Sequence, residues 1–581
     1  MNPETKTHST GATNSLQASS VQACQNCKND FTIEPDDFLF YEKIKVPPPT
    51  FCPQCRMQRR AVFRNQNKLF RNKSSVSGQN ILALVPMESS IKVVTQEEWF
   101  SDDWDPIDSG MEIDFSRPFL SQLMDLHFKI PQYNLNVARM VNSPYSGNAE
   151  DLKNCYMIFN ATSSEDCVYG TGYYFSKNCL DNCDIYNSEL CSNSFWLEKC
   201  SRVHFSEECK ECIEVYFSKN CANCMYCVGC VNLRNKSYCI ENIQYTKEEY
   251  YKKLQEFGFD KYSNLIKYKN FILDFWNKFP KKYLQGVMNL NSSGVYVTES
   301  KNVKDSYIVK GGENLKYVQF INEAPNKDSM DITVWGTNSE LAYEYSACGS
   351  GIYNSKFLVD CWPDVRNSEY SLHCRSSNAL FGCVGLSKKE YCIFNKQYTK
   401  DEYFEMVDKI KKHMNQMPYI DKKGLIYKYG EFFPIEFSWY GYNNTLAQEL
   451  LPLTKEEALE QHYAWYEVQQ TNYVATMNSV DLPDSILDTP DDIVSEVIQC
   501  DCSKKYKIIP QELILLKSIK IPIPRTCPDC RYQEKINRRL KPVLYKMKCM
   551  KNECSNVFET GYDPKDDHVV YCEKCYQQEV Y

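Results

Sequence analysis

Thirty cysteines are the residues of this 581-residue chain whose type and spacing could carry chemistry. Near the two ends of the sequence, twelve of them stand in the short pairs "CQNC", "CPQC", "CDC", "CPDC", "CMKNEC" and "CEKC". Two such pairs separated by a loop can place four thiolates around one tetrahedral ion, which is the pattern of a structural zinc site. The sequence therefore predicts about three Zn²⁺ ions per chain, bound by Cys24, Cys27, Cys52 and Cys55, by Cys500, Cys502, Cys527 and Cys530, and by Cys549, Cys554, Cys572 and Cys575.

The second of these predicted sites is a copy of the first. "CKNDFTIEPDDFLFYEKIKVPPPTFCPQCR" aligns without gaps with "CSKKYKIIPQELILLKSIKIPIPRTCPDCR", and both stretches separate the inner cysteines by 25 positions. The copy has lost one residue from its first pair, which tightens the chelate and weakens the case for Cys500 as a ligand. His568 lies in the loop of the third site, where four cysteines are already present, so we expect it at the surface.

The other eighteen cysteines lie between positions 155 and 392 and recur at regular intervals. Short β-branched and aromatic segments such as "CIEVYFS" and "NSKFLVDC" separate them, with Ser, Asn and Asp at the turns. Short strands at constant spacing predict a parallel β-solenoid, in which small apolar cysteines stack from rung to rung. Every twelfth position is a cysteine along Cys155, Cys167, Cys179 and Cys191, and every ninth along Cys212, Cys221, Cys230 and Cys239.

The run "CANCMYCVGC", residues 221–230, has two interpretations, because cysteines at this spacing can also hold an iron–sulfur cluster. The stretch "GCVNLRNKSYCIENIQYTKEEY" at 229–250 recurs as "GCVGLSKKEYCIFNKQYTKDEY" at 382–403, with 15 of 22 positions identical. At that offset Cys224 corresponds to Ser377 and Cys227 to Leu380, and neither replacement is a ligand to iron. We interpret the run as solenoid wall, and a metal cluster is the alternative.

Each copy of the duplicated zinc module continues into basic residues, in "CRMQRRAVFRNQNKLFRNK" and "CRYQEKINRRLK". Because the chain carries a net charge of −8, any binding of nucleic acid must be local. Cations beside a rigid metal site favour contacts with RNA or DNA phosphates, and a solvated or internally paired face is the alternative. The predicted nucleic-acid-binding residues are Arg56, Arg59, Arg60, Arg64, Arg71, Arg531, Lys535, Arg538 and Arg539.

Signatures of catalysis are sparse in this sequence. None of the seven histidines stands in a nucleophile motif, and "KGGENLK" lacks the Lys-Ser/Thr of a phosphate-binding loop. Asp360 and Asp364 are the carboxylates that a β-helix carbohydrate-active enzyme would use. The acidic stretch "EEWFSDDWDP" lacks the ligand spacing of a calcium loop, so we expect a tryptophan-anchored turn there. We therefore expect a protein that is not an enzyme.

The elements that must position these residues define a mostly β protein, with two parallel β-solenoid blocks that carry helical caps. Thr246 with Glu249, and Thr399 with Glu402, form capping boxes that start the two cap helices. The predicted units are a disordered tail (1–20), zinc ribbon 1 with its basic extension (21–75), a mixed α/β connector (76–140), β-solenoid block 1 (141–245), a helical cap and connector (246–287), β-solenoid block 2 (288–398), a helical cap (399–420), a connector with an acidic linker (421–495), zinc ribbon 2 (496–541) and zinc ribbon 3 (542–581).

Several stretches along almost the whole chain carry a resemblance: "FYEKIKVPPPTFCPQCRMQRR", "EEWFSDDWDP", "DFSRPF", "GCVNLRNKSYCI", "YNNTLAQELLPLTKEEAL", "IIPQEL", "PRTCPDCR" and "YCEKCYQQEVY". On these, the chain resembles a family of uncharacterised, cysteine-rich zinc-ribbon proteins of small-genome candidate-phylum bacteria, with giant-virus relatives. The resemblance implies zinc binding without an established reaction. It gives ligand roles to Cys24/Cys27, Cys52/Cys55, Cys527/Cys530 and Cys572/Cys575, and the chain departs from it at "CDC" and "CMKNEC", where Cys-x2-Cys is expected.

The sequence thus predicts a zinc-binding, non-enzymatic scaffold that binds nucleic acid or a nucleoprotein complex through its basic zinc ribbons. A structural or virion-type assembly protein, acting through self-assembly or protein partners, is one alternative, and a β-helix carbohydrate-active enzyme is the other. No apolar run reaches the roughly 18 residues that span a bilayer, and the polar start of the chain has no apolar core of a signal peptide. We therefore expect a cytoplasmic protein with reduced thiols and no membrane partner.

Overall fold

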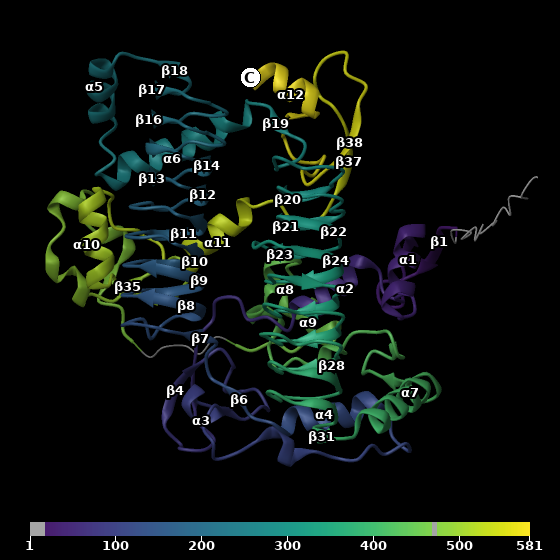
Figure 1. Ribbon diagram of the computed structural model, residues 1–581. Helices are drawn as coiled ribbons and strands as arrows, with labels where there is room; N and C mark the ends of the chain where they lie inside the picture. Colours follow the sequence, from purple (N-terminus) through teal and green to yellow (C-terminus); the bar gives the residue numbers. More distant parts are fainter. Residues whose placement is uncertain (1–17, 468–472, 581) are drawn as a thin grey trace, which may run out of the picture.

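The computed structural model describes residues 18–467 and 473–580, so the predicted tail lies outside the described residues except for its last three positions. Two stacks of short parallel strands stand side by side, and the cysteine modules lie beside them and at one end (Figure 1). We call these the first stack (β7–β18) and the second stack (β20–β31). None of the described helices combines the length and the apolar character that crossing a bilayer requires.

The first stack is built from two sheets whose parallel strands pair at a constant register. Tyr156 lies opposite Val168, and Val168 lies opposite Leu180, so that paired residues are twelve positions apart along the chain. The strands are β7 (Val137–Ala138), β8 (Gly147–Lys153), β9 (Tyr156–Glu165), β10 (Val168–Tyr174), β11 (Leu180–Tyr186), β12 (Phe195–Glu198), β13 (Ser201–His204), β14 (Glu207–Lys210), β15 (Ile213–Tyr216), β16 (Met225–Val228), β17 (Ser237–Ile240) and β18 (Ile243–Gln244).

The second stack repeats this arrangement with a less regular register. Gly294 lies opposite Ser306, which is again a step of twelve positions, whereas the step from Gly312 to its partner Asn326 is longer by two positions. The strands are β20 (Gly294–Thr298), β21 (Ser306–Lys310), β22 (Gly312–Lys316), β23 (Gln319–Ile321), β24 (Asn326–Thr333), β25 (Ser339–Glu340), β26 (Tyr343–Ser346), β27 (Lys356–Val359), β28 (Glu369–Leu372), β29 (Asn378–Phe381), β30 (Glu390–Ile393) and β31 (Lys396–Gln397).

A bend at every third residue shapes the backbone of the stacks. From Asn178 to Glu214, each third residue is a non-glycine residue with φ between 47° and 61°. The residue after each bend turns inward, as Cys179 and Cys191 do, and is buried. Four such bends fill one register step. Because the inward positions of this stretch are multiples of three apart, cysteines that occupy them are separated by multiples of three, such as the intervals of nine and twelve.

The interior cysteines also satisfy their thiols locally. The Cys179 Sγ donates to the Lys177 carbonyl at 3.1 Å, and the Cys167 Sγ donates to the Glu165 carbonyl at 3.3 Å. A small, polarizable side chain with a weak donor therefore fits an inward position, where an unpaired polar group would be costly. The prediction that most of these cysteines are wall residues agrees with their burial.

Each stack ends in the same antiparallel hairpin, followed by a helix that covers its side. β17 pairs with β18, and β30 pairs with β31. α5 (Lys247–Phe257) and α7 (Lys400–Gln416) begin at the predicted capping boxes. α6 (Tyr262–Asn277) packs on the first stack, where Tyr268 and Ile272 lie against Gly229, and α4 (Phe119–Lys129) places Phe119 against Gly382 of the second stack.

The three cysteine modules are small units of hairpins and helices. The first contains β1 (Ser20–Ala23), β2 (Asp30–Ile33), α1 (Pro35–Ile44) and α2 (Pro53–Ala61). The second contains β35 (Ile498–Gln499), β36 (Lys505–Tyr506), α10 (Pro510–Ile519) and α11 (Pro528–Arg538), and the third contains β37 (Tyr545–Lys548), β38 (Val557–Thr560), β39 (Val570–Tyr571) and α12 (Glu573–Val580). The first module lies beside the second stack and the second module beside the first stack (Figure 1).

Short elements connect these parts. They are β3 (Phe70–Lys73), β4 (Asn80–Ala83), β5 (Val93–Val94), α3 (Gln96–Trp99), η1 (Pro106–Ser109), β6 (Gln132–Tyr133), β19 (Lys281–Lys282), β32 (Tyr419–Ile420), β33 (Ile426–Tyr427), η2 (Ile435–Phe437), η3 (Tyr442–Asn444), α8 (Leu446–Leu450), α9 (Lys455–Glu460), β34 (Met477–Asn478), η4 (Ser479–Asp481), η5 (Ile486–Asp488) and η6 (Asp491–Ser495).

Candidate metal centres

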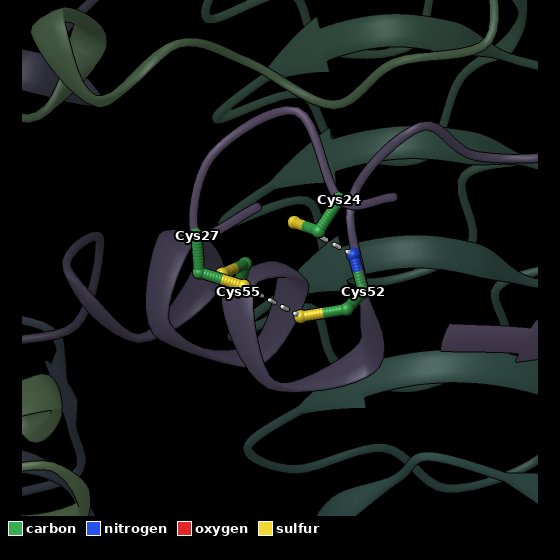
Figure 2. A group of neighbouring side chains, drawn as sticks. All are labelled: Cys24, Cys27, Cys52 and Cys55. Carbon is green, nitrogen blue, oxygen red and sulfur yellow. Dashed lines mark hydrogen bonds between the residues drawn. The ribbon is translucent and has the colours of Figure 1, made fainter. Parts of the chain in front are cut away.

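The first centre brings Cys24, Cys27, Cys52 and Cys55 together, with all four sulfurs within 4.8 Å of one another (Figure 2). Cys24 and Cys27 lie in the turn between β1 and β2, while Cys52 caps the N-terminus of α2 and Cys55 lies in its first turn. The Cys27 and Cys52 sulfurs are 3.8 Å apart. A tetrahedral zinc site with Zn–S bonds of about 2.3 Å places its sulfurs about 3.8 Å apart, so the geometry fits this ion.

The second and third centres have the same geometry despite their altered pairs. Cys500 and Cys530 place their sulfurs 3.9 Å apart, and Cys554 lies 3.9 Å from Cys572. In the first module the Lys28 N–H donates to the Cys24 carbonyl, four residues back, whereas in the second the Ser503 N–H donates to the Cys500 carbonyl, three residues back. A tighter turn thus absorbs the missing residue, and Cys500 stays in the group.

A backbone hydrogen bond to sulfur recurs in all three centres. The Cys52 N–H donates to the Cys24 Sγ at 3.2 Å, and the N–H groups of Cys527 and Cys572 donate in the same way to Cys500 and Cys549 at 3.3 Å. Such donors stabilise negative charge on a thiolate ligand. Hydrogen bonding to the Cys52 and Cys55 thiols also lowers the pKa of Cys24, while the Cys24 thiol raises the pKa of Cys52 to about 11. The three four-cysteine groups are consistent with about three zinc ions per chain.

Cys221, Cys224, Cys227 and Cys230 form no comparable group in the described part of the chain. They are the four inward positions of one register step of the first stack. The Cys224 Sγ donates to the carbonyl of Ala222 at 3.3 Å, and its counterpart Ser377 donates to the Arg375 carbonyl at 2.6 Å. Serine and cysteine thus fill the same inward position with the same hydrogen bond, which supports the wall interpretation. His568 lies outside the third centre, with its Nδ1 at 2.7 Å from the Lys281 Nζ.

The predicted nucleic-acid contacts of the first module are wrong for Arg56, Arg59 and Arg60, because α2 turns all three inward. The Arg56 Nε donates to Asp331 at 2.9 Å, and the two side chains are 1% and 0% exposed. Arg59 pairs with Glu344 at 2.8 Å and Arg60 pairs with Asp331 at 3.1 Å. These ion pairs attach α2 to β24 and β26 of the second stack.

Two further basic residues of the first module differ in exposure. Arg64 donates to the Asn160 Oδ1 of the first stack at 2.5 Å, so this guanidinium is also engaged inside the molecule. Arg71, on β3, is exposed, and it alone of the nine predicted nucleic-acid contacts is exposed in the described structure. Arg56, Arg59, Arg60 and Arg64 therefore contribute little to a cationic surface beside the first centre.

The second module uses its basic residues in the same way. Arg531 pairs with Asp181 of the first stack at 2.9 Å and with Glu512 of α10 at 3.0 Å, and all three side chains are buried. The Lys535 Nζ, also buried, donates to the Arg531 carbonyl at 2.8 Å. The remaining two pair with acidic residues of the first stack: Arg538 with Glu207 at 3.2 Å, and Arg539 with Asp184. The nucleic-acid prediction is wrong for the buried Arg531, Lys535 and Arg539 as well, because their charges are used internally, whereas Arg538 stays 24% exposed.

The two interfaces between module and stack are equivalent. Arg56 and Arg531 occupy matching positions of the duplicated module, and each lies 2.9 Å from the carboxylate of an aspartate that adopts a left-handed bend in the stack beside it. Each guanidinium also lies over a tyrosine ring, Arg56 at 5.3 Å from the Tyr317 centroid and Arg531 at 5.1 Å from that of Tyr169. The sequence analysis missed these acidic and aromatic partners. All four lie within the stretches predicted to form the two solenoid blocks, and that position could have suggested them.

Asp360 and Asp364 do not meet in one site. Asp360 lines a small cavity of about 40 Å³ with Arg64 and His373, and its carboxylate lies 3.8 Å from the His373 Nδ1. Burial raises the pKa of Asp360 to about 7, against the opposing charge of Arg64. Asp364 instead lies at the surface, 3.7 Å from Arg366. The pair of carboxylates expected for a carbohydrate-active site is therefore not assembled by these two residues.

The acidic stretch 97–105 folds as a turn anchored by tryptophans. The Trp104 Nε1 donates to the carbonyls of Glu98 and Trp99 at 3.1 Å, and the two indole rings are 4.7 Å apart. Within the described residues, its carboxylates do not form a group that could hold an ion. The expected turn is confirmed.

No protein-family model matches the chain, and a search of curated proteins found no match. The resemblance to candidate-phylum zinc-ribbon proteins therefore stays a prediction. The functional argument rests on the three cysteine centres and on the two interfaces between modules and stacks.

Proposed function

We propose that the protein is a rigid, zinc-held scaffold whose duplicated metal modules each lock onto one of two solenoid bodies. One observation carries the proposal: the arginine that follows the last ligand of each duplicated centre is buried in an ion pair with a stack. Because zinc binding supplies the folding energy of small four-cysteine modules, the metal fixes the helix that presents this arginine. The metal sites are thereby coupled to the assembly of the whole body.

We infer that both stacks are four-sided parallel β-solenoids. The constant register of the first stack and the left-handed bend at every third residue support this inference. Stacked rungs contact only their neighbours, so a solenoid is a stiff, elongated body, and its ends need covering. Such a body suits a protein that holds partners at fixed positions rather than one that performs chemistry.

Binding of nucleic acid through the predicted basic ribbons loses its main support, because most of the residues proposed for it make contacts inside the molecule. Of the nine residues proposed for it, Arg71 stays exposed, on β3 beside the exposed Lys73. Two neighbouring cations supply only a weak and strongly salt-dependent attraction for phosphate. Contact with a protein partner or self-assembly fits the scaffold better. We therefore propose a structural role for the protein in place of nucleic-acid binding.

Elemental analysis of anaerobically purified protein tests the metal part of this proposal. We expect about three zinc ions per chain and neither iron nor acid-labile sulfide, because each of the three groups has the sulfur spacing of a tetrahedral site. Fewer than three tightly bound ions would remove a centre from the proposed scaffold. Iron with stoichiometric sulfide would overturn the wall interpretation of residues 221–230.

A further inference from the structure

The two stacks end in the same motif, but among the described residues only the second stack has its end covered by another segment of the chain. Residues 104–112 lie across that end. The Met111 N–H donates to the Phe394 carbonyl at 3.0 Å, and the Asn395 Nδ2 donates to the Pro106 carbonyl at 2.9 Å. The approach is close enough that a side chain at Gly110 would meet the Asn395 carbonyl oxygen at 2.8 Å.

Charge fixes the covering segment in place. Lys389 pairs with Asp105 at 2.8 Å, and Lys396 pairs with Glu112. The Tyr398 hydroxyl donates to the same Glu112 carboxylate at 3.2 Å. The end of the second stack is thus a receptor for an acidic segment, built from two lysines, a tyrosine and backbone groups.

An apolar side chain of the segment completes the cover. Ile107 packs against the buried interior cluster of the second stack, which includes Cys383 and Cys392. The corresponding cluster of the first stack is contacted at its margins by Met140 and Leu233, neither of which comes from a segment that crosses the equivalent end. Among the described residues, the interior column of the first stack therefore has no counterpart of Ile107.

The end of the first stack presents a related receptor without an occupant from the described residues. Asn242 makes the same two hydrogen bonds to Val231 that Asn395 makes to Val384, at 2.8 and 3.0 Å. Ile243, at the position of Lys396, is 58% exposed. No described backbone donor reaches the Glu241 carbonyl, which is the counterpart of the Phe394 carbonyl that accepts from Met111.

Lysine and tyrosine are also retained at this end. Lys236 occupies the position of Lys389, is exposed, and has no ion pair among the described residues. Tyr245 stands at the position of Tyr398. The end of the first stack therefore keeps one of the two lysines and the tyrosine that hold the acidic segment on the second stack, with Ile243 in place of the second lysine.

We propose that the end of the first stack, formed by Lys236, Glu241, Asn242, Ile243 and Tyr245, is a docking site for an acidic, glycine-containing segment of a partner protein. The segment binds across the end as residues 104–112 bind across the second stack, with an apolar side chain over the interior column. This inference goes beyond the zinc-held scaffold, which would form without it, and it gives the scaffold a specific point of attachment.

A peptide with the chain's own covering sequence, DWDPIDSGMEI (residues 103–113), is the probe for this site. The end of the second stack is already occupied by the tethered copy, so a labelled peptide reports on the first stack. We expect saturable binding to zinc-loaded, full-length protein by fluorescence anisotropy. Ile243→Lys, which restores the lysine of the second stack, should tighten binding about 2- to 5-fold, and Lys236→Glu should weaken it about 3- to 10-fold.

Controls separate this site from nonspecific attraction. Lys92→Glu makes the same charge change on an exposed lysine of the connector and should leave the affinity unchanged. A peptide with Asp105→Lys and Glu112→Lys should not bind.

Absence of saturable binding to both the wild type and Ile243→Lys would overturn the proposal. The proposal would also be overturned if the wild type formed a dimer that Lys236→Glu dissociated and the peptide did not. In that case a second copy of the chain would occupy the end of the first stack. Zinc content and melting are measured on the same samples, so a failure here is distinguishable from a failure of the scaffold.

Discussion

Replacing Arg531 with methionine should destabilise the contact between the second module and the first stack by about 3–5 kcal/mol. The substitution keeps most of the side-chain volume but leaves the buried carboxylates of Asp181 and Glu512 without their ion-pair partner. Urea unfolding at pH 8, followed by circular dichroism, measures the loss. Arg71→Met removes an exposed arginine and serves as the matched control, with an expected change within about 0.5 kcal/mol.

The stability that Arg531→Met loses should increase as the pH rises. Burial raises the pKa of Glu512 to about 7 even though Arg531 opposes the shift, and removing Arg531 raises this pKa further. When the pKa of a carboxyl group is higher in the folded than in the unfolded protein, the free energy of unfolding falls as the pH rises from the unfolded pKa to the folded one. The penalty of Arg531→Met should therefore be smaller at pH 5.5 than at pH 8. An equal penalty at both values would contradict the burial of an unpaired carboxylate.

Replacing Cys52 with serine should remove about one zinc ion per chain, whereas replacing Cys224 with serine should remove none. Cys52 is one of four sulfurs in the first centre, and loss of one thiolate opens a four-coordinate site. Cys224 faces the interior of the first stack, where Ser377 already fills the equivalent position of the second. Metal analysis after gel filtration measures both outcomes. Loss of metal from the Cys224 variant would show that the wall cysteines are ligands.

The metal centres could be predicted from the sequence because their determinants are local. Each centre depends on two short cysteine pairs and on the turn and helix start that hold them, and the altered pairs "CDC" and "CMKNEC" needed only a different turn. The helix starts at Thr246 and Thr399 were predictable for the same reason, since a capping box involves residues three positions apart. The strand-rich, parallel character of the chain followed from the spacing of Cys155, Cys167 and Cys179.

The burial of the arginine side chains and their ion-pair partners could not be predicted from the residues next to them in the sequence. Arg56 and its partner Asp331 are 275 positions apart, and nothing near Arg56 distinguishes a buried cation from a solvated one. Left-handed bends at residues such as Tyr226 and Ile308 were also unexpected, because side chains of this kind disfavour positive φ. Both features follow from the stacks, where each rung constrains the next, so they become visible only when distant strands are placed side by side.

Hydrogen–deuterium exchange of the zinc-loaded and chelator-treated protein tests most directly the claim that metal centres hold the modules against the stacks. Removing zinc should increase exchange in α2 and α11, which carry Arg56 and Arg531 into the two interfaces, and in the facing strands β24 and β11. Strands far from both modules, such as β16, should keep their protection. Unchanged protection of α2 and α11 after complete loss of zinc would contradict the account, because the docking would then stand without the metal.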